Sequence, residues 1–395
     1  MKSIIEKQRQ THVAAECQVL VAGGGIAGIA AALAAARRGA DVLLIERECM
    51  LGGLATLGLI TIYLPLCDGM GRQVSFGIAE ELLRLSIRHG AEDKYPQAWL
   101  ENGSPEERKA QRFEVQYNPH LFAVEAERLL LSEGVRILYN TLICGAVKRD
   151  DKISHIIIEN KSGRSAIEAK SVVDCTGDAD VCLLSGEETA VFAQKNVLAN
   201  WYYYTQSGQV HLAQLGAADI PDEYKDKDVP APLVGRRFTG LDGMEISEML
   251  QLAHVQMLKN VLKKRETDPS HTPVAMPVIP QLRMTRRIVG ARTLDDKQPH
   301  THFDDGIGLI GNWRKRGPVY AIPFSTLYGN RVKNLITAGR CISVTDAMWD
   351  LTRVIPACAI TGQAAGTAAA MTDSFESLDA ALLQKELEKD GAVIA

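Results

Sequence analysis

The residues whose types and spacing point most directly to chemistry are three glycines near the start of the chain. Gly23, Gly25 and Gly28 form the pattern G-x-G-x-x-G directly after the apolar run 19–22. In this pattern the first glycine permits a tight turn, the second lets a pyrophosphate approach the backbone, and the third allows close packing of helix and strand. Backbone amides at the start of the following helix then face the phosphates. Because Glu46, 18 residues after Gly28, can accept hydrogen bonds from ribose hydroxyls, the segment predicts a dinucleotide site that suits FAD and NAD alike.

Three further glycine turns indicate a long cofactor that threads several strand ends. The first turn, at residues 51–56, contains the pair Gly52 and Gly53, which lets the chain pass against a flat ring. The second turn ends an apolar strand at 172–178, and the third ends another at 335–340. Each turn alone is equally compatible with an ordinary loop, but their recurrence along one chain favours a shared ligand.

A cluster of arginines at residues 282–287 is suited to binding an anion. Guanidinium groups hold carboxylates and phosphates through two parallel hydrogen bonds, which makes Arg283 and Arg286 candidate substrate ligands. A solvated surface with ion pairs is the alternative interpretation of the same cluster.

Other side chains are candidates for proton transfer or stacking. His302, close to Asp304 and Asp305, can carry a proton near neutral pH, although a lone histidine is more often structural or exposed. Tyr320 has a hydroxyl that can donate to a substrate. The aromatic run 201–204 can stack on a sugar or an aromatic ring, but the alternation of side chains along a strand favours core packing.

The elements that position these residues alternate between strand and helix. A strand at 18–22, a helix at 26–38 and a strand at 41–46 predict a βαβ unit with parallel strands. The remaining elements are expected as a helix at 118–133 capped by Asn118, a strand at 135–139, an antiparallel meander of 142–148, 154–159 and 165–169, strands at 171–174 and 334–338 in the main sheet, a helix at 356–371, and a last helix at 378–389 capped by Ser377.

Composition and charge limit the classes of function. The chain has 395 residues and a formal net charge of −4, which argues against a nucleic-acid partner. Its eight cysteines form no Cys-x-x-Cys pair, so we expect no metal site and reduced thiols in the cytoplasm. Residues 1–16 lack the charge order of a signal peptide. Two uncharged runs, 17–36 and 354–371, are rich in alanine and glycine, which argues against a membrane span.

With these motifs in place, the sequence resembles the FAD-dependent oxidoreductases of the glutathione-reductase-like flavoprotein superfamily, loosely akin to fumarate reductase and heterodisulfide reductase flavoproteins. The resemblance covers about residues 15–185 and 280–372. It is carried by the segments 23–28, 46, 52–53, 174–178, 283–287, 339–340 and 362–366. Other branches of the family often have Asp where this chain has Arg340, so the contact made by Arg340 is a departure from the family pattern.

The resemblance implies one cofactor, FAD, and two sets of site residues. The implied FAD-binding residues are Gly23, Gly25, Ile26, Ala27, Gly28, Glu46, Arg47, Gly52, Gly53, Leu54, Ala55, Thr176, Gly177, Asp178, Gly339, Arg340, Gly362 and Ala365. The candidate catalytic residues are Arg283, Arg286, His302, Tyr320 and Arg353. The resemblance also directs the helix start after Arg353 at the pyrimidine end of the flavin, where the helix dipole and the arginine can stabilise negative charge. A packed core helix preceded by an exposed arginine is the alternative.

The predicted fold class is α/β: a Rossmann-like FAD-binding domain with an antiparallel meander, plus an inserted α+β substrate domain. The FAD-binding domain is expected in three segments, 13–75, 118–185 and 332–375. A helical excursion on the substrate side is expected at 76–117, the inserted substrate domain at 186–331, and a C-terminal helix at 376–395.

The function expected from this resemblance is hydride transfer between a small polar or anionic organic substrate and flavin N5. The partners are then a small-molecule substrate and an unidentified electron acceptor, and the sequence is compatible with a homo-oligomer. A flavin-dependent monooxygenase and an electron-transfer subunit of a larger complex are the alternatives. The lack of clustered cysteines argues against the second, and the acidic balance argues against a flavin-dependent RNA-modifying protein.

Overall fold

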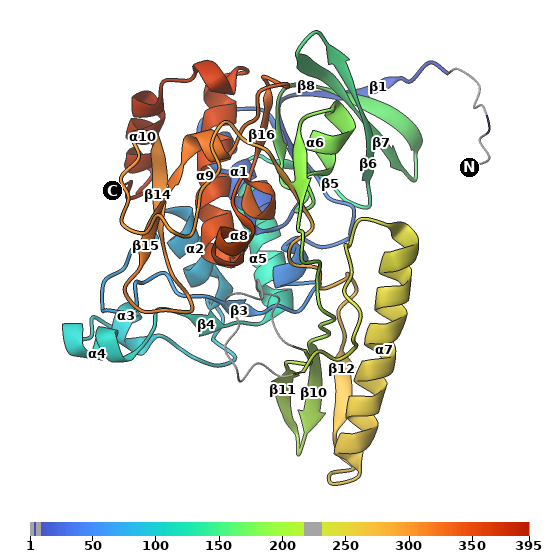
Figure 1. The fold of residues 1–395 in the computed structure, drawn as a ribbon, viewed down its shortest axis with the longest axis vertical. Helices are drawn as coiled ribbons and strands as arrows, with labels where there is room; N and C mark the ends of the chain where they lie inside the picture. The colour runs from blue at the N-terminus through green and yellow to red at the C-terminus, as the bar shows by residue number, and fades with distance from the viewer. Residues whose placement is uncertain (1–3, 5–8, 217–230, 395) are drawn as a thin grey trace.

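The protein is described by a computed structural model that covers residues 4, 9–216 and 231–394. Residues 1–3, 5–8, 217–230 and 395 are outside the described residues. Parts of three expectations fall on them: the segment 1–16, the domain 186–331 and the C-terminal helix 376–395. A seven-stranded sheet forms the centre of the fold, in the order β5-β2-β1-β8-β7-β6 with β16 paired to β8 (Figure 1). Its strands are β1 (Val13–Ala22), β2 (Val42–Ile45), β5 (Arg136–Leu138), β6 (Leu142–Arg149), β7 (Lys152–Asn160), β8 (Gly163–Asp174) and β16 (Leu335–Thr337).

The pairing within this sheet confirms the predicted α/β fold. β1 runs parallel to β2 and β8, β2 runs parallel to β5, and β8 runs parallel to β16. β6, β7 and β8 form the predicted antiparallel meander. The predicted break at residue 170 is wrong, because β8 is one strand from Gly163 to Asp174 that pairs with β1 on both sides of that residue. The same pairing extends β1 back to Val13, five residues before its predicted start.

Two helices rich in small residues pack against each other beside the sheet. They are α1 (Ile26–Arg37) and α9 (Ile355–Met371), and nearly all of their residues are buried. Gly362 and Gly366 permit the contact: a Cβ on Gly362 would lie 2.3 Å from the carbonyl oxygen of Ala27, and one on Gly366 would lie 2.0 Å from that of Ala31. In the part of the chain that the structure describes, no single helix is long and apolar enough to cross a membrane. The bent pair of α8 (Asp346–Thr352) and α9 passes that test of length and composition, with an angle of 89° between the two helices.

The other helices and short strands cover the edges of this core. They are β3 (Ile62–Tyr63), α2 (Ile78–Ser86), α3 (Gln97–Leu100), α4 (Pro105–Ala110), β4 (Val115–Gln116), α5 (Pro119–Ser132), α6 (Asp180–Ser185) and α10 (Ala380–Lys389). α5 begins as predicted, because the Asn118 side chain accepts hydrogen bonds from the N–H groups of His120 and Leu121. The predicted cap of the last helix is wrong: Asp379 caps α10, whereas Ser377 lies in the preceding 3-10 turn.

The region between α6 and β16 divides into two parts. One part is a lobe in which β10 (Tyr202–Gln206), β11 (Gln209–Ala213) and β12 (Thr272–Ala275) form a sheet beside the long helix α7 (Gly243–Arg265), at the bottom right of Figure 1. The other part, the hairpin of β14 (Gly306–Gly311) and β15 (Val319–Pro323), packs with α9 in the main hydrophobic core. β9 (Thr189–Val191) precedes the lobe in the chain and pairs with β13 (Arg286–Ile288), which follows the lobe.

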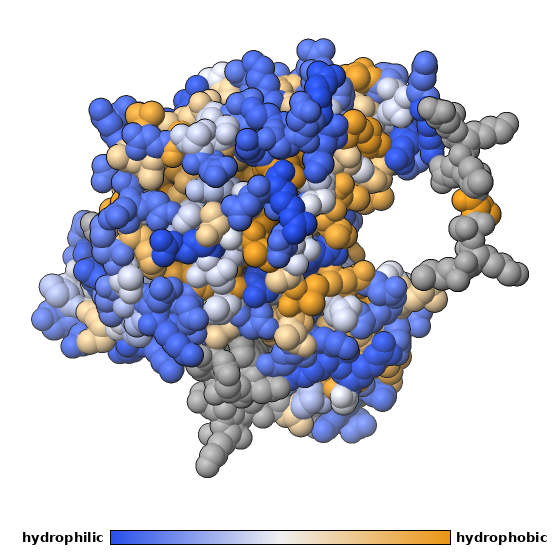
Figure 2. Space-filling model, turned by 45° about the horizontal axis from the view of Figure 1, so that its top comes forward, coloured by the Kyte–Doolittle hydropathy of each residue, from blue (hydrophilic) through white to orange (hydrophobic). Residues whose placement is uncertain are grey.

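Within the aromatic run 201–204, Tyr202 and Tyr203 are buried in the lobe, as core packing predicts. The Tyr202 hydroxyl donates to Asn260 of α7 at 2.7 Å, and the Tyr203 hydroxyl pairs with Thr61 of the main body at 2.7 Å. The face of the molecule in Figure 2 is mainly polar, with apolar residues showing in separate patches between the polar ones. The hydrogen bond between Tyr203 and Thr61 thus links the lobe to the Rossmann-type body.

Candidate active site

A cavity of about 870 Å³ lies at the carboxyl ends of the parallel strands. Its wall includes Gly23 after β1, Glu46 after β2, Cys175 after β8 and Ala338 after β16. Ligands of open α/β sheets bind outside the carboxyl ends of the strands. The cavity also extends to residues of the lobe, Trp201 and Leu233 among them, so both parts of the fold contribute to one site.

The glycine turn after β1 leaves the start of α1 open to this cavity. A Cβ on Gly25 would meet no atom within 4 Å, and no side chain caps the helix start at this residue. The first amides of α1 are therefore available to an anion such as a pyrophosphate. Gly23 and Gly28 serve the turn itself, because a Cβ on Gly23 would lie 2.6 Å from the carbonyl oxygen of Cys175 and one on Gly28 1.8 Å from that of Gly23.

Glu46 lies where the ribose-binding carboxylate is expected. It is 6% exposed, lines the cavity, and accepts hydrogen bonds from the N–H groups of Gly24 at 2.6 Å and Glu48 at 2.9 Å. Burial raises the pKa of this carboxyl group, and the two N–H donors oppose that effect. The backbone N–H of Gly52 donates to the carbonyl oxygen of Gly24 at 2.8 Å, so the turn at Gly52 lies next to the glycine turn after β1.

Replacing Glu46 by alanine is expected to weaken FAD binding by about 1–3 kcal/mol, the range for a charge-assisted hydrogen bond. The free energy is measured by titrating FAD into apoprotein. Glu46→Gln keeps one acceptor oxygen and is expected to fall between Glu46→Ala and wild type. Equal FAD affinity in all three proteins would show that Glu46 does not contact the cofactor.

Arg340, the departure from the family pattern, lies beside the second glycine turn. Its guanidinium pairs with Asp178 at 3.1 Å and donates to the carbonyl oxygen of Leu282 at 3.1 Å. A Cβ on Gly177 would lie 2.6 Å from the Arg340 Nη2 atom. The Thr285 hydroxyl donates to the same carboxylate at 2.5 Å, so Asp178 fixes the position of the arginine in the cavity wall.

The start of α9 forms another part of the wall. Val354 caps the helix without a side-chain hydrogen bond, and Pro356 occupies the first turn. Arg353 and Arg314 both bind the buried carboxylate of Asp350, at 2.6 Å and 2.5 Å, so the two guanidiniums are held together. Cys358, in the next turn of α9, is a neutral thiol, because burial raises its pKa to about 12.

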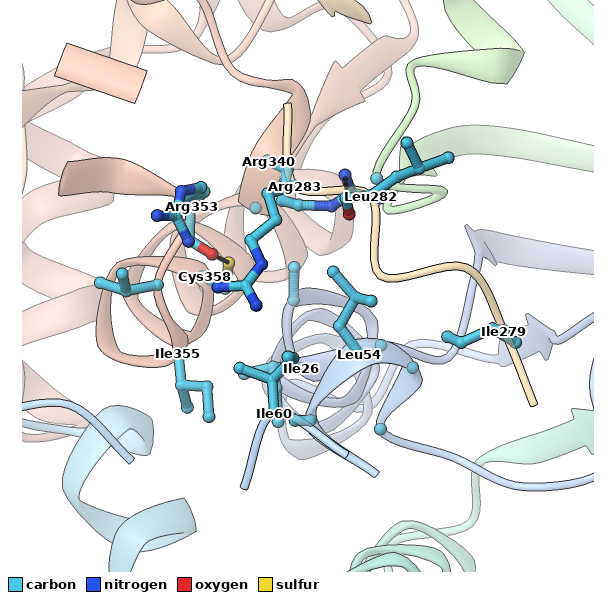
Figure 3. Close-up of a pocket in the computed structure, with 18 of the residues that line it drawn as sticks. Ile26, Leu54, Ile60, Ile279, Leu282, Arg283, Arg340, Arg353, Ile355 and Cys358 are labelled. Atoms are coloured by element: carbon cyan, nitrogen blue, oxygen red, sulfur yellow. Dashed lines mark hydrogen bonds between the residues drawn. The ribbon is translucent and has the colours of Figure 1, made fainter. Parts of the chain in front are cut away.

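Arg283 extends into the middle of the cavity. It is 5% exposed, and its guanidinium lies 5.1 Å from the centre of the Trp201 ring. Figure 3 shows this group between Arg353 and Cys358 on one side and Leu54 on the other. A guanidinium can bind a carboxylate through two parallel hydrogen bonds, and it can also stack on an aromatic ring.

Three of the predicted catalytic residues do not line the cavity. Arg286 lies on β13 and pairs with Asp180 at 3.4 Å, and burial raises the pKa of that carboxyl group to about 6. The His302 side chain is 69% exposed and pairs only with the exposed Asp304 among the contacts recorded for it. Tyr320 is buried, and its hydroxyl donates to the backbone carbonyl of Asp296 at 3.0 Å. The structure therefore moves these three residues out of the candidate site.

Three of the predicted FAD-binding residues also lie outside the wall. Gly28, Gly362 and Ala365 are small because helices and strands approach each other closely at these positions. The predicted residues that do line the cavity are Gly23, Gly25, Ile26, Ala27, Glu46, Arg47, Gly52, Gly53, Leu54, Ala55, Thr176, Gly177, Asp178, Gly339 and Arg340, together with Arg283 and Arg353.

Other residues of the wall were missed by the sequence analysis. Arg112 donates to the backbone carbonyl of Trp313 at 2.5 Å, and the Arg314 guanidinium lies 3.9 Å from the centre of the Trp313 ring. All three residues line the cavity. The only local signal was the basic and aromatic run at 313–316, which does not distinguish a site from a surface loop.

Comparison with known proteins defines the class of protein. The family model described as FAD dependent oxidoreductase matches residues 18–231 and 225–387, so the chain belongs to this family. The protein is therefore an oxidoreductase that uses FAD. The open cradle at Gly25, the uncapped start of α1 and the carboxylate of Glu46 fit the pyrophosphate and ribose of that cofactor.

The individual proteins and structures compared with this chain have low sequence identity to it. A thiamine thiazole synthase from Methanococcus vannielii is 31% identical over 178 residues, which span 42% of this chain and 58% of that relative. The solved structure of p-nitrophenol 4-monooxygenase from Pseudomonas putida is similar in fold over 94% of this chain and 84% of that chain, with a TM-score of 0.51 and 11% identity. A geranylgeranyl bacteriochlorophyll reductase-like protein from Thermoplasma acidophilum gives a TM-score of 0.46 at 14% identity over 95% of this chain and 82% of that chain.

Proposed function

We propose that the protein transfers a hydride between a small organic substrate that carries an anionic group and N5 of FAD. FAD supplies the redox chemistry when bound, and the residues of the chain bind the substrate, orient it and exclude water. The observation that carries the proposal is Arg283, a buried guanidinium that extends into the cavity (Figure 3).

The charge balance of the cavity wall supports an anionic substrate. Outside the dinucleotide motif and its glycine turns, the wall carries four arginines: Arg112, Arg283, Arg314 and Arg353. Asp350 offsets one of these charges, and Glu114 is paired with Lys94 at 3.4 Å. Guanidinium groups favour carboxylates and phosphates as ligands, and Arg283 is the buried one of these four.

An apolar part of the wall supports a substrate with a carbon skeleton. Its side chains are Ile60, Ile62, Leu64, Leu233 and Ile279. Apolar side chains bury the skeleton and keep water from the reacting atoms, while a few polar groups fix the orientation. We therefore infer that the substrate is an organic acid held at its anionic end by Arg283.

We further propose that Arg353 and the start of α9 stabilise the negative charge of reduced FAD. Both line the cavity, and the first amides of α9 have no side-chain cap. A helix N-terminus carries a partial positive charge that favours an anion. Asp350 holds Arg353 in place, so this residue has a positioning role for the arginine.

Arg353→Met is expected to lower the reduction potential of bound FAD by roughly 30–60 mV, the equivalent of about 1.4–2.8 kcal/mol for a two-electron couple. The potential is measured by anaerobic titration against a reference dye. Arg287→Met is the matched control, because Arg287 pairs with Asp346 at 3.3 Å and lies outside the cavity wall. A potential unchanged by Arg353→Met, or lowered equally by the control, would contradict the proposed role.

The proposed reaction is tested by mixing the FAD-loaded protein anaerobically with hydroxy acids, amino acids, amines and neutral sugars. We expect the visible flavin absorbance to bleach with a compound that has a carboxylate or phosphate. Bleaching by neutral sugars alone would contradict the proposal. A reaction that needs dioxygen and adds an oxygen atom to the product would replace it with a monooxygenase.

A further inference from the structure

The long helix α7 has a stripe of exposed residues along its outer side. Met244, Val255, Leu258 and Leu262 are 80%, 46%, 56% and 54% exposed. They share one side of the helix with three exposed polar residues, so the complete set, here called the α7 stripe, is Met244, Glu248, Gln251, Val255, Leu258, Leu262 and Arg265. Successive members are alternately four and three residues apart, which is the spacing of a coiled-coil seam.

The opposite side of α7 accounts for its packing within the chain. Met249, Ala253 and Val261 are buried against the lobe, and Asn260 accepts a hydrogen bond from Tyr202. Figure 1 shows α7 along the outer edge of the lobe, with one long side directed away from the rest of the chain. The apolar members of the α7 stripe therefore contribute nothing to the packing of the lobe, and apolar side chains grouped on an exposed helix face indicate an interaction surface.

The charges on α7 make this surface complementary to a second copy of itself. The first part of the helix carries Glu245 and Glu248, and the last part carries Lys263, Lys264 and Arg265. When two such helices pack antiparallel, the acidic part of each faces the basic part of the other, and the helix dipoles oppose each other favourably.

The spacing of the α7 stripe also fixes one register for such a pair. Placing Val255 opposite Leu258 of the partner subunit places Gln251 opposite Leu262 of the partner subunit. The same register brings Glu248 opposite Arg265 of the partner subunit. Within their own chain, Glu248 binds Arg236, and Arg265 donates to the carbonyl oxygen of His271 at 2.8 Å, so both side chains are already held at the surface.

We propose that two copies of this chain form a two-fold symmetric dimer by packing their α7 stripes antiparallel. A symmetric dimer uses the same self-complementary patch on both subunits. α7 has 23 residues, which corresponds to a seam of about 34 Å. No residue of α7 lines the candidate active site, so dimer formation leaves the cavity open in both subunits.

The proposal is tested by sedimentation of the full chain loaded with FAD, over a range of concentrations. We expect a mass of twice the 43.1 kDa of the chain, and the mass of a single chain for Leu258→Glu, with the visible flavin spectrum unchanged. Val124→Glu is the matched control: Val124 is 62% exposed on α5, and this variant is expected to remain dimeric. A wild-type monomer at every concentration, or a dimer that survives Leu258→Glu, would overturn the proposal.

A charge exchange tests the register even where Leu258→Glu fails to fold. Glu248→Arg alone is expected to weaken the dimer, because it places two positive side chains opposite each other, and adding Arg265→Glu is expected to restore it. A double variant as weak as the single one would overturn the antiparallel register. A wild-type protein that stays monomeric but sediments with vesicles of anionic phospholipid would instead assign the α7 stripe to a membrane surface.

Discussion

Gly25→Val is expected to give a folded protein that no longer retains FAD. A Cβ at this position meets no protein atom within 4 Å, and the backbone of Gly25 is extended (φ −67°), so we expect the fold to tolerate valine here. It would instead occupy the space through which the pyrophosphate approaches the start of α1. We expect the affinity for FAD to fall by about 100-fold or more, which is roughly 3 kcal/mol. The measurement is the flavin content of the purified protein, together with its circular dichroism spectrum.

Gly243→Val is the matched control for this experiment. Gly243 begins α7, a Cβ there also meets no atom within 4 Å, and the residue lies outside the cavity wall. We expect this variant to retain FAD at the wild-type level. Normal flavin content in Gly25→Val would show that the cofactor does not approach the backbone at this turn.

Arg283→Lys is expected to lower kcat/KM by roughly 10- to 100-fold, or about 1.4–2.8 kcal/mol, without changing the flavin spectrum. Lysine keeps the charge but loses the planar fork that holds a carboxylate and stacks on the Trp201 ring. Arg283→Ala removes the charge as well, and a buried charge pair that loses one partner costs about 2–5 kcal/mol. Steady-state kinetics with the substrate found by anaerobic bleaching measures both effects.

Arg286→Lys is the internal comparison for the arginine prediction. Arg286 lies in the same cluster but does not line the cavity, and its guanidinium pairs with Asp180 of the wall at 3.4 Å. We expect Arg286→Lys to keep this pair and to retain wild-type kinetics. Loss of turnover in Arg286→Lys together with normal turnover in Arg283→Lys would show that the wrong arginine has been assigned to the substrate.

The dinucleotide end of the site could be predicted because its signals are local. Gly23, Gly25 and Gly28 belong to one strand, turn and helix, and Glu46 ends the next strand of the same βαβ unit. The spacing of these residues is set by the backbone geometry of the unit itself. Gly23, Gly25 and Glu46 line the cavity because of that local structure, whereas Gly28 does not line it.

The small residues of α9 show why residue type alone does not place a residue in the cavity wall. A run of small residues indicates close approach, but it does not say whether a cofactor or another helix approaches. In the structure Gly362 lies against the carbonyl of Ala27, so the space that a cofactor was expected to fill belongs to α1. The distinction depends on which elements meet in three dimensions.

The arginines also show that residue type and spacing do not decide which residues line the cavity. Arg283 and Arg286 are equivalent by residue type and spacing, and only the course of the chain directs the first into the cavity and the second toward Asp180. Arg112 and Arg314 lie far apart in the sequence, and neither has a local motif that marks it as part of a site. Arg314 directly follows Trp313, but only the fold brings Arg112 to Trp313, and no feature of the Arg112 segment could predict that contact.

The central claim, that this FAD-dependent oxidoreductase acts on an organic acid held by Arg283, is tested most directly by a matched pair of compounds. The measurement is the rate of anaerobic flavin bleaching by one carboxylic acid and by its neutral amide, in wild type and in Arg283→Lys. We predict that wild type prefers the acid strongly and that Arg283→Lys loses most of that preference, with FAD still bound. Equal bleaching by acid and amide in the wild-type protein would contradict the claim.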